Sequence, residues 1–206
     1  MRSSGEEGRR LLGEAVAAYR SALEVHTKAD LPQGWAMTQN NLGAALYDLG
    51  RSSGEEEGMK LRRESVEAFR EVVAYQPNDQ SRFMLSRYLG GFAFSLVLNR
   101  RFAEAQAQCE EAQRLANVIG DGIQKTDRDD LILIQQNLAH ALLFQGHYDE
   151  ALTIYRENCN KPLHGESFGE ITLEDFAAFD KADLTSPDLS RMKQALGDLG
   201  SETPSP

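Results

Sequence analysis

The chain is poor in cysteine, proline and histidine, with 2, 6 and 4 of these among its 206 residues. Two cysteines are too few for the disulfide framework of small secreted proteins, so we expect a reducing, cytoplasmic compartment. Three of the six prolines follow residue 186, which leaves the first 160 positions almost free of the residue that most strongly breaks helices. The composition therefore favours an all-α chain.

Basic residues and long apolar runs are also scarce. Acidic side chains outnumber lysine and arginine by 32 to 22, giving a formal charge of -10. This balance argues against nucleic acid or an anionic membrane as the partner, because phosphate binding depends on clustered cations. No apolar run is long enough to span a bilayer, and residues 1–7 contain no apolar core of a signal peptide. We expect a protein or peptide partner that is neutral or basic.

Motifs that carry catalysis are absent as well. The sequence contains no phosphate-binding glycine loop, nucleophile elbow, paired-histidine helix or Cys-x-x-Cys pair. Cys159 and His164 are close enough to share a metal, but further ligands at a suitable spacing are missing. We therefore expect neither an enzyme nor a cofactor or metal site.

An internal repeat is the strongest positive signal. The hexapeptide Arg-Ser-Ser-Gly-Glu-Glu at residues 2–7 recurs at residues 51–56. Identities then continue at an offset of 50, among them Gly8 with Gly58 and Leu11 with Leu61. Repeats of this length are typical of units that bury their apolar faces by stacking on one another.

Apolar residues at helical spacing predict a series of helices separated by Gly, Pro and Ser. The expected ranges are 9–26 and 35–49, a third ending at Pro77, and then 80–98, 102–117, 129–145 and 148–158. Ser4-x-x-Glu7 and Ser53-x-x-Glu56 have the pattern of a capping box at a helix start. Residues 164–170 are predicted to be a linker, followed by a short helix with Leu173, Phe176 and Phe179 on its apolar face and a last helix opened by Ser186-Pro187.

Pairs of these helices resemble the tetratricopeptide repeat. The matching residues are Leu42-Gly43-x-x-Leu46 with Phe69 and Pro77, Phe92-Ala93-x-x-Leu96 with Phe102, Ala105 and Cys109, and Leu138-Ala139-x-x-Leu142 with Tyr148, Ala151 and Tyr155. The Gln-Asn-Asn-Leu-Gly stretch at residues 39–43 is similar to bacterial arrays of about 50-residue repeats and to kinesin light chain. The resemblance implies a right-handed α-solenoid of helix-turn-helix hairpins with a C-terminal helical cap.

The expected organisation follows from this resemblance. It comprises an array over 1–162 with an unpaired second helix at 9–27 and repeats at 33–77, 80–118 and 128–162, then capping helices at 163–200 and a disordered tail at 201–206. Cys109 occupies a core-filling position of its repeat and is expected to be inert.

Two asparagines, Asn41 and Asn137, stand at the same register of two first helices. The resemblance implies that an asparagine there faces the concave groove and hydrogen-bonds the backbone of an extended peptide. The alternative is that both merely bond neighbouring helices. The further groove residues that we expect are Asn40, Tyr47, Arg87, Phe94, Gln136, His140 and Phe144.

The function that these patterns favour is a non-catalytic protein-protein interaction scaffold. Two alternatives stay open, a self-assembly module and a docking segment of a longer bacterial signalling protein. The unpaired N-terminal helix is expected to leave part of its apolar face uncovered and to support a homodimer through Leu12 and Tyr19.

Overall fold

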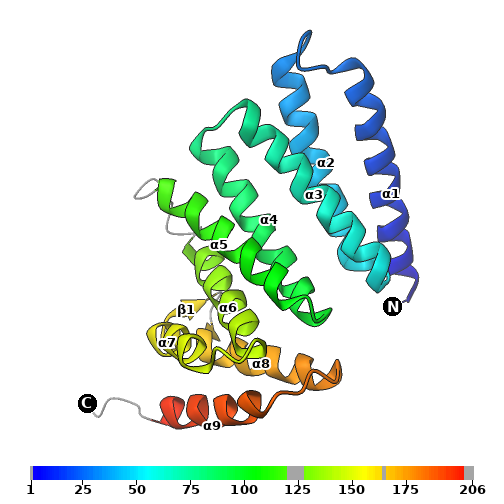
Figure 1. The fold of residues 1–206 in the computed structure, drawn as a ribbon. Coiled ribbons are helices and arrows are strands. Elements are labelled where there is room, and N and C mark those ends of the chain that lie inside the picture. The colour runs from blue at the N-terminus through cyan, green and yellow to red at the C-terminus, as the bar shows by residue number, and fades with distance from the viewer. Residues whose placement is uncertain (1, 120–127, 164–165, 202–206) are drawn as a thin grey trace. The chain divides into compact units, whose positions relative to one another are not determined.

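The computed structural model describes residues 2–119, 128–163 and 166–201, and over these residues the chain is helical, as expected. The only strands in these ranges are β1 (Pro162–Leu163) and β2 (Glu166–Ser167), which pair antiparallel. The helices of Figure 1 are α1 (Arg2–Val25), α2 (Pro32–Ser52), α3 (Glu55–Tyr75), α4 (Asp79–Leu98), α5 (Phe102–Ile119), α6 (Arg128–Phe144), α7 (Tyr148–Asn158), α8 (Phe168–Lys181) and α9 (Pro187–Ser201).

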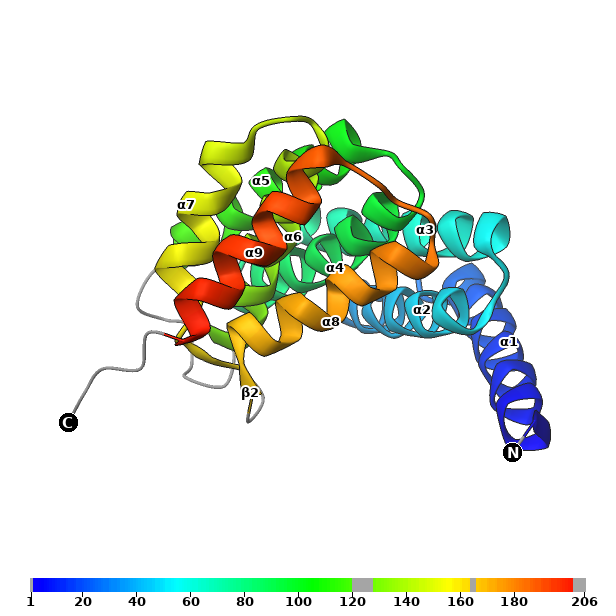
Figure 2. The ribbon, with the colours of Figure 1, turned by 90° about the horizontal axis from the view of Figure 1, so that it is seen from below.

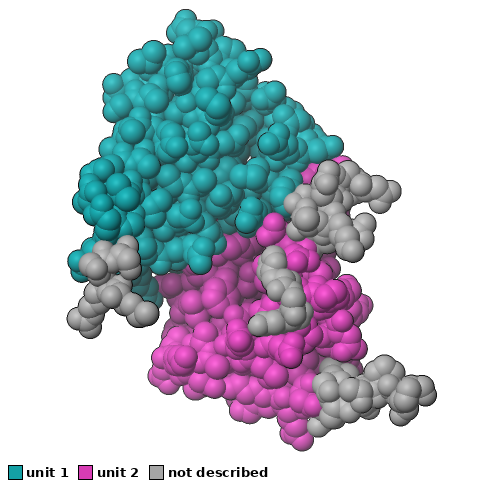
Figure 3. Space-filling model, turned by 180° about the vertical axis from the view of Figure 1, so that it is seen from behind, with its two compact units in different colours: residues 1–88 teal, residues 89–206 magenta. Residues whose placement is uncertain are grey.

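The chain divides into two compact units, residues 1–88 and residues 89–206, which Figure 3 colours separately. The boundary falls inside α4, so this one helix contributes its first half to unit 1 and its second half to unit 2. No helix in the described ranges is long and apolar enough to cross a membrane.

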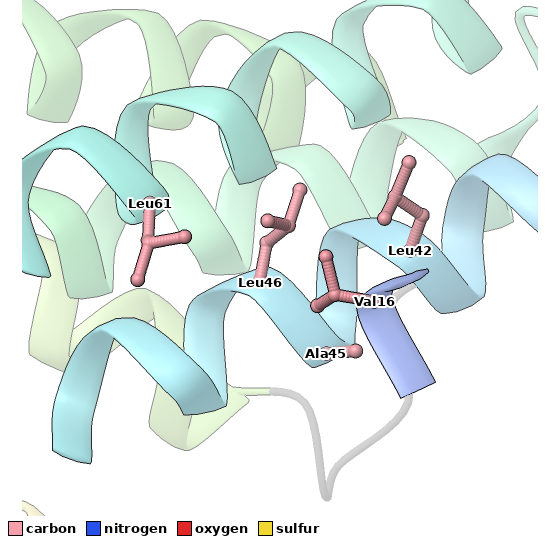
Figure 4. Packing of buried hydrophobic residues seen from close by; sticks show 5 residues of the cluster. All are labelled: Val16, Leu42, Ala45, Leu46 and Leu61. Atoms are coloured by element: carbon pink, nitrogen blue, oxygen red, sulfur yellow. The ribbon is translucent and has the colours of Figure 1, made fainter. Parts of the chain in front are cut away.

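Unit 1 is built from helices that are neighbours in sequence and run in alternating directions (Figure 1). Its core includes a cluster drawn from α1, α2 and α3, in which Val16, Leu42, Ala45, Leu46 and Leu61 are all buried (Figure 4). Helix α2 supplies Leu42, Ala45 and Leu46, at the three- and four-residue spacing that places side chains on one face. The apolar periodicity of the sequence therefore corresponds to this shared core.

Small residues let α2 and α3 approach closely. A Cβ on Gly43 would lie 2.7 Å from the Phe69 ring, which fills the space beside it. A Cβ on Gly58 would lie 2.6 Å from the carbonyl oxygen of Gly50. The hydroxyl of Ser65 donates a 2.7 Å hydrogen bond to the carbonyl of Gly43, inside the same contact. The crossing depends on glycine because backbone atoms, unlike flexible side chains, cannot move aside.

Unit 2 contains the second half of α4 and α5 to α9, with α8 and α9 side by side in Figure 2. Its largest fully buried side chains include Tyr155 from α7 and three phenylalanines of α8, Phe168, Phe176 and Phe179. A capping box starts α8, in which the Ser167 hydroxyl accepts from the Glu170 amide and the Glu170 carboxylate accepts from the Ser167 amide. The linker expected at 164–170 is thus wrong from Phe168 onward, because this capping box begins the helix earlier.

The two capping boxes expected from Ser4 and Ser53 are not formed. Residues 2–7 are helical and belong to α1, so Ser4 lies inside a helix. Before α3 the N-cap is Gly54, with no side-chain cap, and the Ser53 hydroxyl instead donates to the Leu49 carbonyl at the end of α2. The same hexapeptide is therefore helix at 2–7 and a helix end, turn and helix start at 51–56.

Most helix boundaries agree with the expected ranges within a few residues. The largest difference is at the N-terminus, where the helix expected over 9–27 occupies 2–25. The tail expected to be disordered at 201–206 falls largely outside the described residues, and Ser201 is the last residue of α9.

Candidate functional site

Asn41 lies on the exposed surface of α2, as a groove residue should. Its side chain makes no hydrogen bond to the described part of the chain, and Met37, one turn earlier, is also exposed. Asn40 is half-buried, and its amide oxygen is buried without a hydrogen-bond partner. A buried acceptor without a donor is uncommon and costs free energy.

Tyr47 lies two turns further along α2 and is half-buried. Its ring packs edge-on against Tyr88 at a centroid distance of 5.0 Å. Burial raises the pKa of the Tyr47 hydroxyl, and this effect is opposed by the charges of Arg62, Arg51 and Arg87. Arg87 itself is exposed on α4. The structure thus places the predicted residues Asn40, Asn41, Tyr47 and Arg87 together in unit 1.

Asn137 has a different role, although its local sequence resembles that of Asn41. It is buried, and its Nδ2 donates a 3.1 Å hydrogen bond to the carbonyl of Gly90 on α4. Helix α6 approaches α4 so closely there that a Cβ on Gly90 would lie 2.6 Å from Cγ1 of Ile134. Of the two interpretations of these asparagines, interhelix packing describes Asn137, whereas Asn41 is free of such a contact.

A buried polar network joins α6 to α7 and α8. The Gln136 amide nitrogen donates to Asp175 at 2.9 Å, and His140 Nε2 lies 3.0 Å from the same carboxylate oxygen. A carboxylate accepts hydrogen bonds, so His140 donates through Nε2, and its Nδ1 lies 2.6 Å from the Tyr155 hydroxyl. Burial, and secondarily the charge of Asp175, raises the pKa of Tyr155, so its hydroxyl keeps the proton that it donates. The imidazole is therefore hydrogen-bonded on both sides.

Phe179 of α8 contacts the remaining predicted groove residues of unit 2. Its ring lies 4.9 Å from His140, 5.2 Å from Phe144 and 6.1 Å from Phe94, measured between centroids. Phe94, His140 and Phe144, which were predicted to line a peptide-binding groove, therefore all lie against this ring. That surface is covered by α8 of the same chain.

The contacts of α8 follow the spacing of a helix bound in a groove. They come from Thr172, Asp175, Phe176 and Phe179, at positions i, i+3, i+4 and i+7. Phe176 and Phe179 were predicted to lie on one apolar face, whereas the roles of Thr172 and Asp175 were not predicted. Leu173 was expected on the same face but is exposed. The i, i+3, i+4, i+7 spacing was the signal that could have identified the set.

Three predicted site residues of α6 are buried. Gln136, Asn137 and His140 expose only 1%, 7% and 0% of their surface. A peptide could not reach these side chains in this structure, in which Gln136 and His140 contact α8 and Asn137 contacts α4. The expectation of an open groove along α6 is corrected accordingly.

Leu12 and Tyr19, expected to mediate self-association, are half-buried within unit 1. Tyr19 packs against the Val16 and Leu46 cluster, together with Leu23. Tyr19 therefore faces the core of unit 1. The exposed large apolar residues of α1 are Leu11 and Val25.

The described residues contain no group of three or more His, Cys, Asp or Glu side chains arranged to hold a metal ion. Of the Cys159 and His164 pair considered above, His164 lies outside the described residues. Cys109 is fully buried on α5, whereas Cys159 is half-buried and its thiol donates to the Arg156 carbonyl at 3.4 Å.

Alkylation should distinguish the two cysteines. Burial raises the pKa of the Cys109 thiol well above its usual range. The thiol is therefore neither accessible to the reagent nor ionised to the reactive thiolate. We expect iodoacetamide to modify Cys159 in the native protein and both cysteines in denaturant, as read by peptide mass spectrometry. Native modification of Cys109 at a rate close to that of Cys159 would contradict the packing of α5.

The comparison with known proteins adds no family. No protein-family model matches the chain, and a search of curated proteins finds no significant match. The likeness to tetratricopeptide repeats therefore rests on the spacing of residues in this sequence.

Proposed function

We propose that the chain is a non-catalytic protein-binding scaffold whose helical hairpins stack as in a right-handed tetratricopeptide solenoid. The binding surface is the exposed face of α2 in unit 1, defined by Met37, Asn40 and Asn41. The observation that carries the proposal is the exposed side chain of Asn41, which makes no hydrogen bond to the described part of the chain and lies one turn from the exposed Met37. One amide side chain can accept from the N–H and donate to the C=O of an extended peptide.

The charge of the chain supports one class of partner. The formal charge is -10, and Asp48 is exposed one turn beyond Ala44 on α2. A neutral or basic peptide is therefore favoured over an acidic one by long-range electrostatics. Two alternatives remain beside this proposal. They are a self-assembly module and a docking segment in a longer bacterial signalling protein, and the experiment described next bears on them as well.

The test begins with short random peptides displayed on phage and selected on the intact chain. Replacing Asn40 and Asn41 together with alanine should weaken the selected peptide by about 1 to 3 kcal/mol, because peptide groups lose their hydrogen bonds. Titration calorimetry measures the affinity, and far-UV circular dichroism should be unchanged.

Asn137→Ala is the matched control. Its amide holds α6 to α4, so this variant should lower the free energy of unfolding and leave the peptide affinity unchanged. If the affinity of no selected peptide falls when Asn40 and Asn41 are replaced, the α2 face is not the binding surface. A self-assembly module is then the favoured function.

A further inference from the structure

One face of α1 carries a regular stripe of small and apolar residues that the chain does not fully cover. Its members recur at alternating spacings of three and four residues, which places them on one side of the helix. They are Gly8, Leu11, Ala15, Ala18, Ala22 and Val25. Leu11 and Val25 expose 51% and 67% of their surface, and Ala18 is also exposed. We call these six residues the α1 stripe.

The internal repeat shows what the same positions do in α3. At the offset of 50 the equivalents are Gly58, Leu61, Ser65, Ala68, Val72 and Tyr75. All except Tyr75 are buried, and Tyr75 packs edge-on against Trp35 of α2 at 5.3 Å. This is the face by which α3 binds α2.

The six equivalent residues of α3 contact α2 along its whole length. Gly58 meets the backbone of Gly50 at one end, and Ser65 donates to the Gly43 carbonyl in the middle. Val72 packs with Trp35 at the other end. The partner face of α2 therefore combines glycines at the close approaches with large apolar residues between and beyond them.

Gly8 marks a clear difference between the two copies of the repeat. Its counterpart Gly58 must be glycine, because a Cβ there would overlap the Gly50 carbonyl oxygen. A Cβ on Gly8 would meet no described atom within 4 Å, as is also true of Gly5 and Gly13 in the same helix. The close contact that requires glycine in α3 is therefore not made by α1 within the described residues.

We propose that the α1 stripe is a docking surface for an amphipathic helix of the α2 type, presented by a partner protein. The docking helix has a small residue facing Gly8 and another near Ala15, which also packs against the core cluster of unit 1. Large apolar residues lie between and beyond these two, in the same pattern as Gly50, Gly43 and Trp35 of α2. A second copy of the stripe fits less well. It would contribute mainly glycine and alanine, which bury little apolar surface.

The probe for this surface is a further copy of residues 32–50, fused directly before Arg2 of the full chain. This fusion recreates the junction between α2 and α3, because Arg-Ser-Ser-Gly follows Gly50 in the native sequence and also begins at Arg2. We expect the fused helix to fold onto the α1 stripe and to raise Tm by about 3 to 8 °C. A fusion with the same residues in scrambled order should give no increase.

Ala18→Glu is the decisive variant. Ala18 is exposed in the chain itself, so the change should leave the Tm of the unfused protein nearly unaltered, but it should remove the gain in the fusion. A Leu11→Cys thiol should likewise be modified at least about tenfold more slowly in the fusion, since local opening must precede reaction. An equal gain with Ala18→Glu, or unchanged Leu11→Cys labelling, would overturn the proposal. So would a dimer of the unfused chain that dissociates with Ala18→Glu in analytical ultracentrifugation, because the occupant would then be a second copy.

Discussion

Gly58→Ala is expected to lower the free energy of unfolding by about 1 to 3 kcal/mol, the usual cost of forcing extra atoms into a packed contact. The added Cβ would lie 2.6 Å from the carbonyl oxygen of Gly50, and both groups are held in helices. The two helices must therefore separate, which loosens the cluster around Leu61. Urea unfolding followed by far-UV circular dichroism measures the loss.

Gly8→Ala provides the matched control, since the two glycines occupy the same position of the internal repeat. Nothing lies within 4 Å of a Cβ at Gly8, so only the helix propensity changes. This variant should gain up to about 1 kcal/mol. A loss of similar size in both variants would show that the contact with Gly50 is not the cause.

Asp175→Ala is expected to destabilise unit 2 by about 2 to 5 kcal/mol, since two buried donors lose their acceptor. Gln136 and His140 both bond the same carboxylate oxygen and are almost completely buried. The unpaired groups would favour detachment of α8 from α6. Denaturant unfolding gives the free energy, and limited proteolysis reports whether α8 is released before the rest of the unit unfolds.

Glu174→Ala tests whether charge on α8 matters in general. Glu174 is the exposed neighbour of Asp175, so its removal should change stability by no more than about 0.5 kcal/mol. If Asp175→Ala is as mild as Glu174→Ala, the carboxylate is not what holds α8 in place.

The helices were predictable because their causes are local. Apolar residues recur at helical spacing along each one, and Pro77, Gly50 and Pro187 mark ends or starts close to the observed boundaries. The close approach at Gly43, where a Cβ would lie 2.7 Å from the Phe69 ring, also has a local sign in the sequence, since a small residue stands there beside large apolar neighbours.

The packing of α8 against α6 in unit 2 could not be predicted from such patterns. Asp175 is separated from Gln136 and His140 by 39 and 35 residues, and no periodicity reports contacts at that distance in sequence. The two asparagines make the same point. Asn41 and Asn137 share a local motif, yet only Asn137 has a Gly90 carbonyl within reach. Similar short sequences thus belong to side chains with different contacts, and the tertiary structure determines which contact each one makes.

The two copies of Arg-Ser-Ser-Gly-Glu-Glu should also differ in mutational tolerance. Gly5 lies inside α1 with open space around it, so most side chains that favour helices should be accepted there. Gly54 is the N-cap of α3 in an extended conformation, where Ser, Asn or Asp should be preferred and large apolar residues rejected. A deep mutational scan would thus return two different substitution profiles for one string of letters. The two copies therefore have the same amino-acid sequence but are subject to different structural constraints.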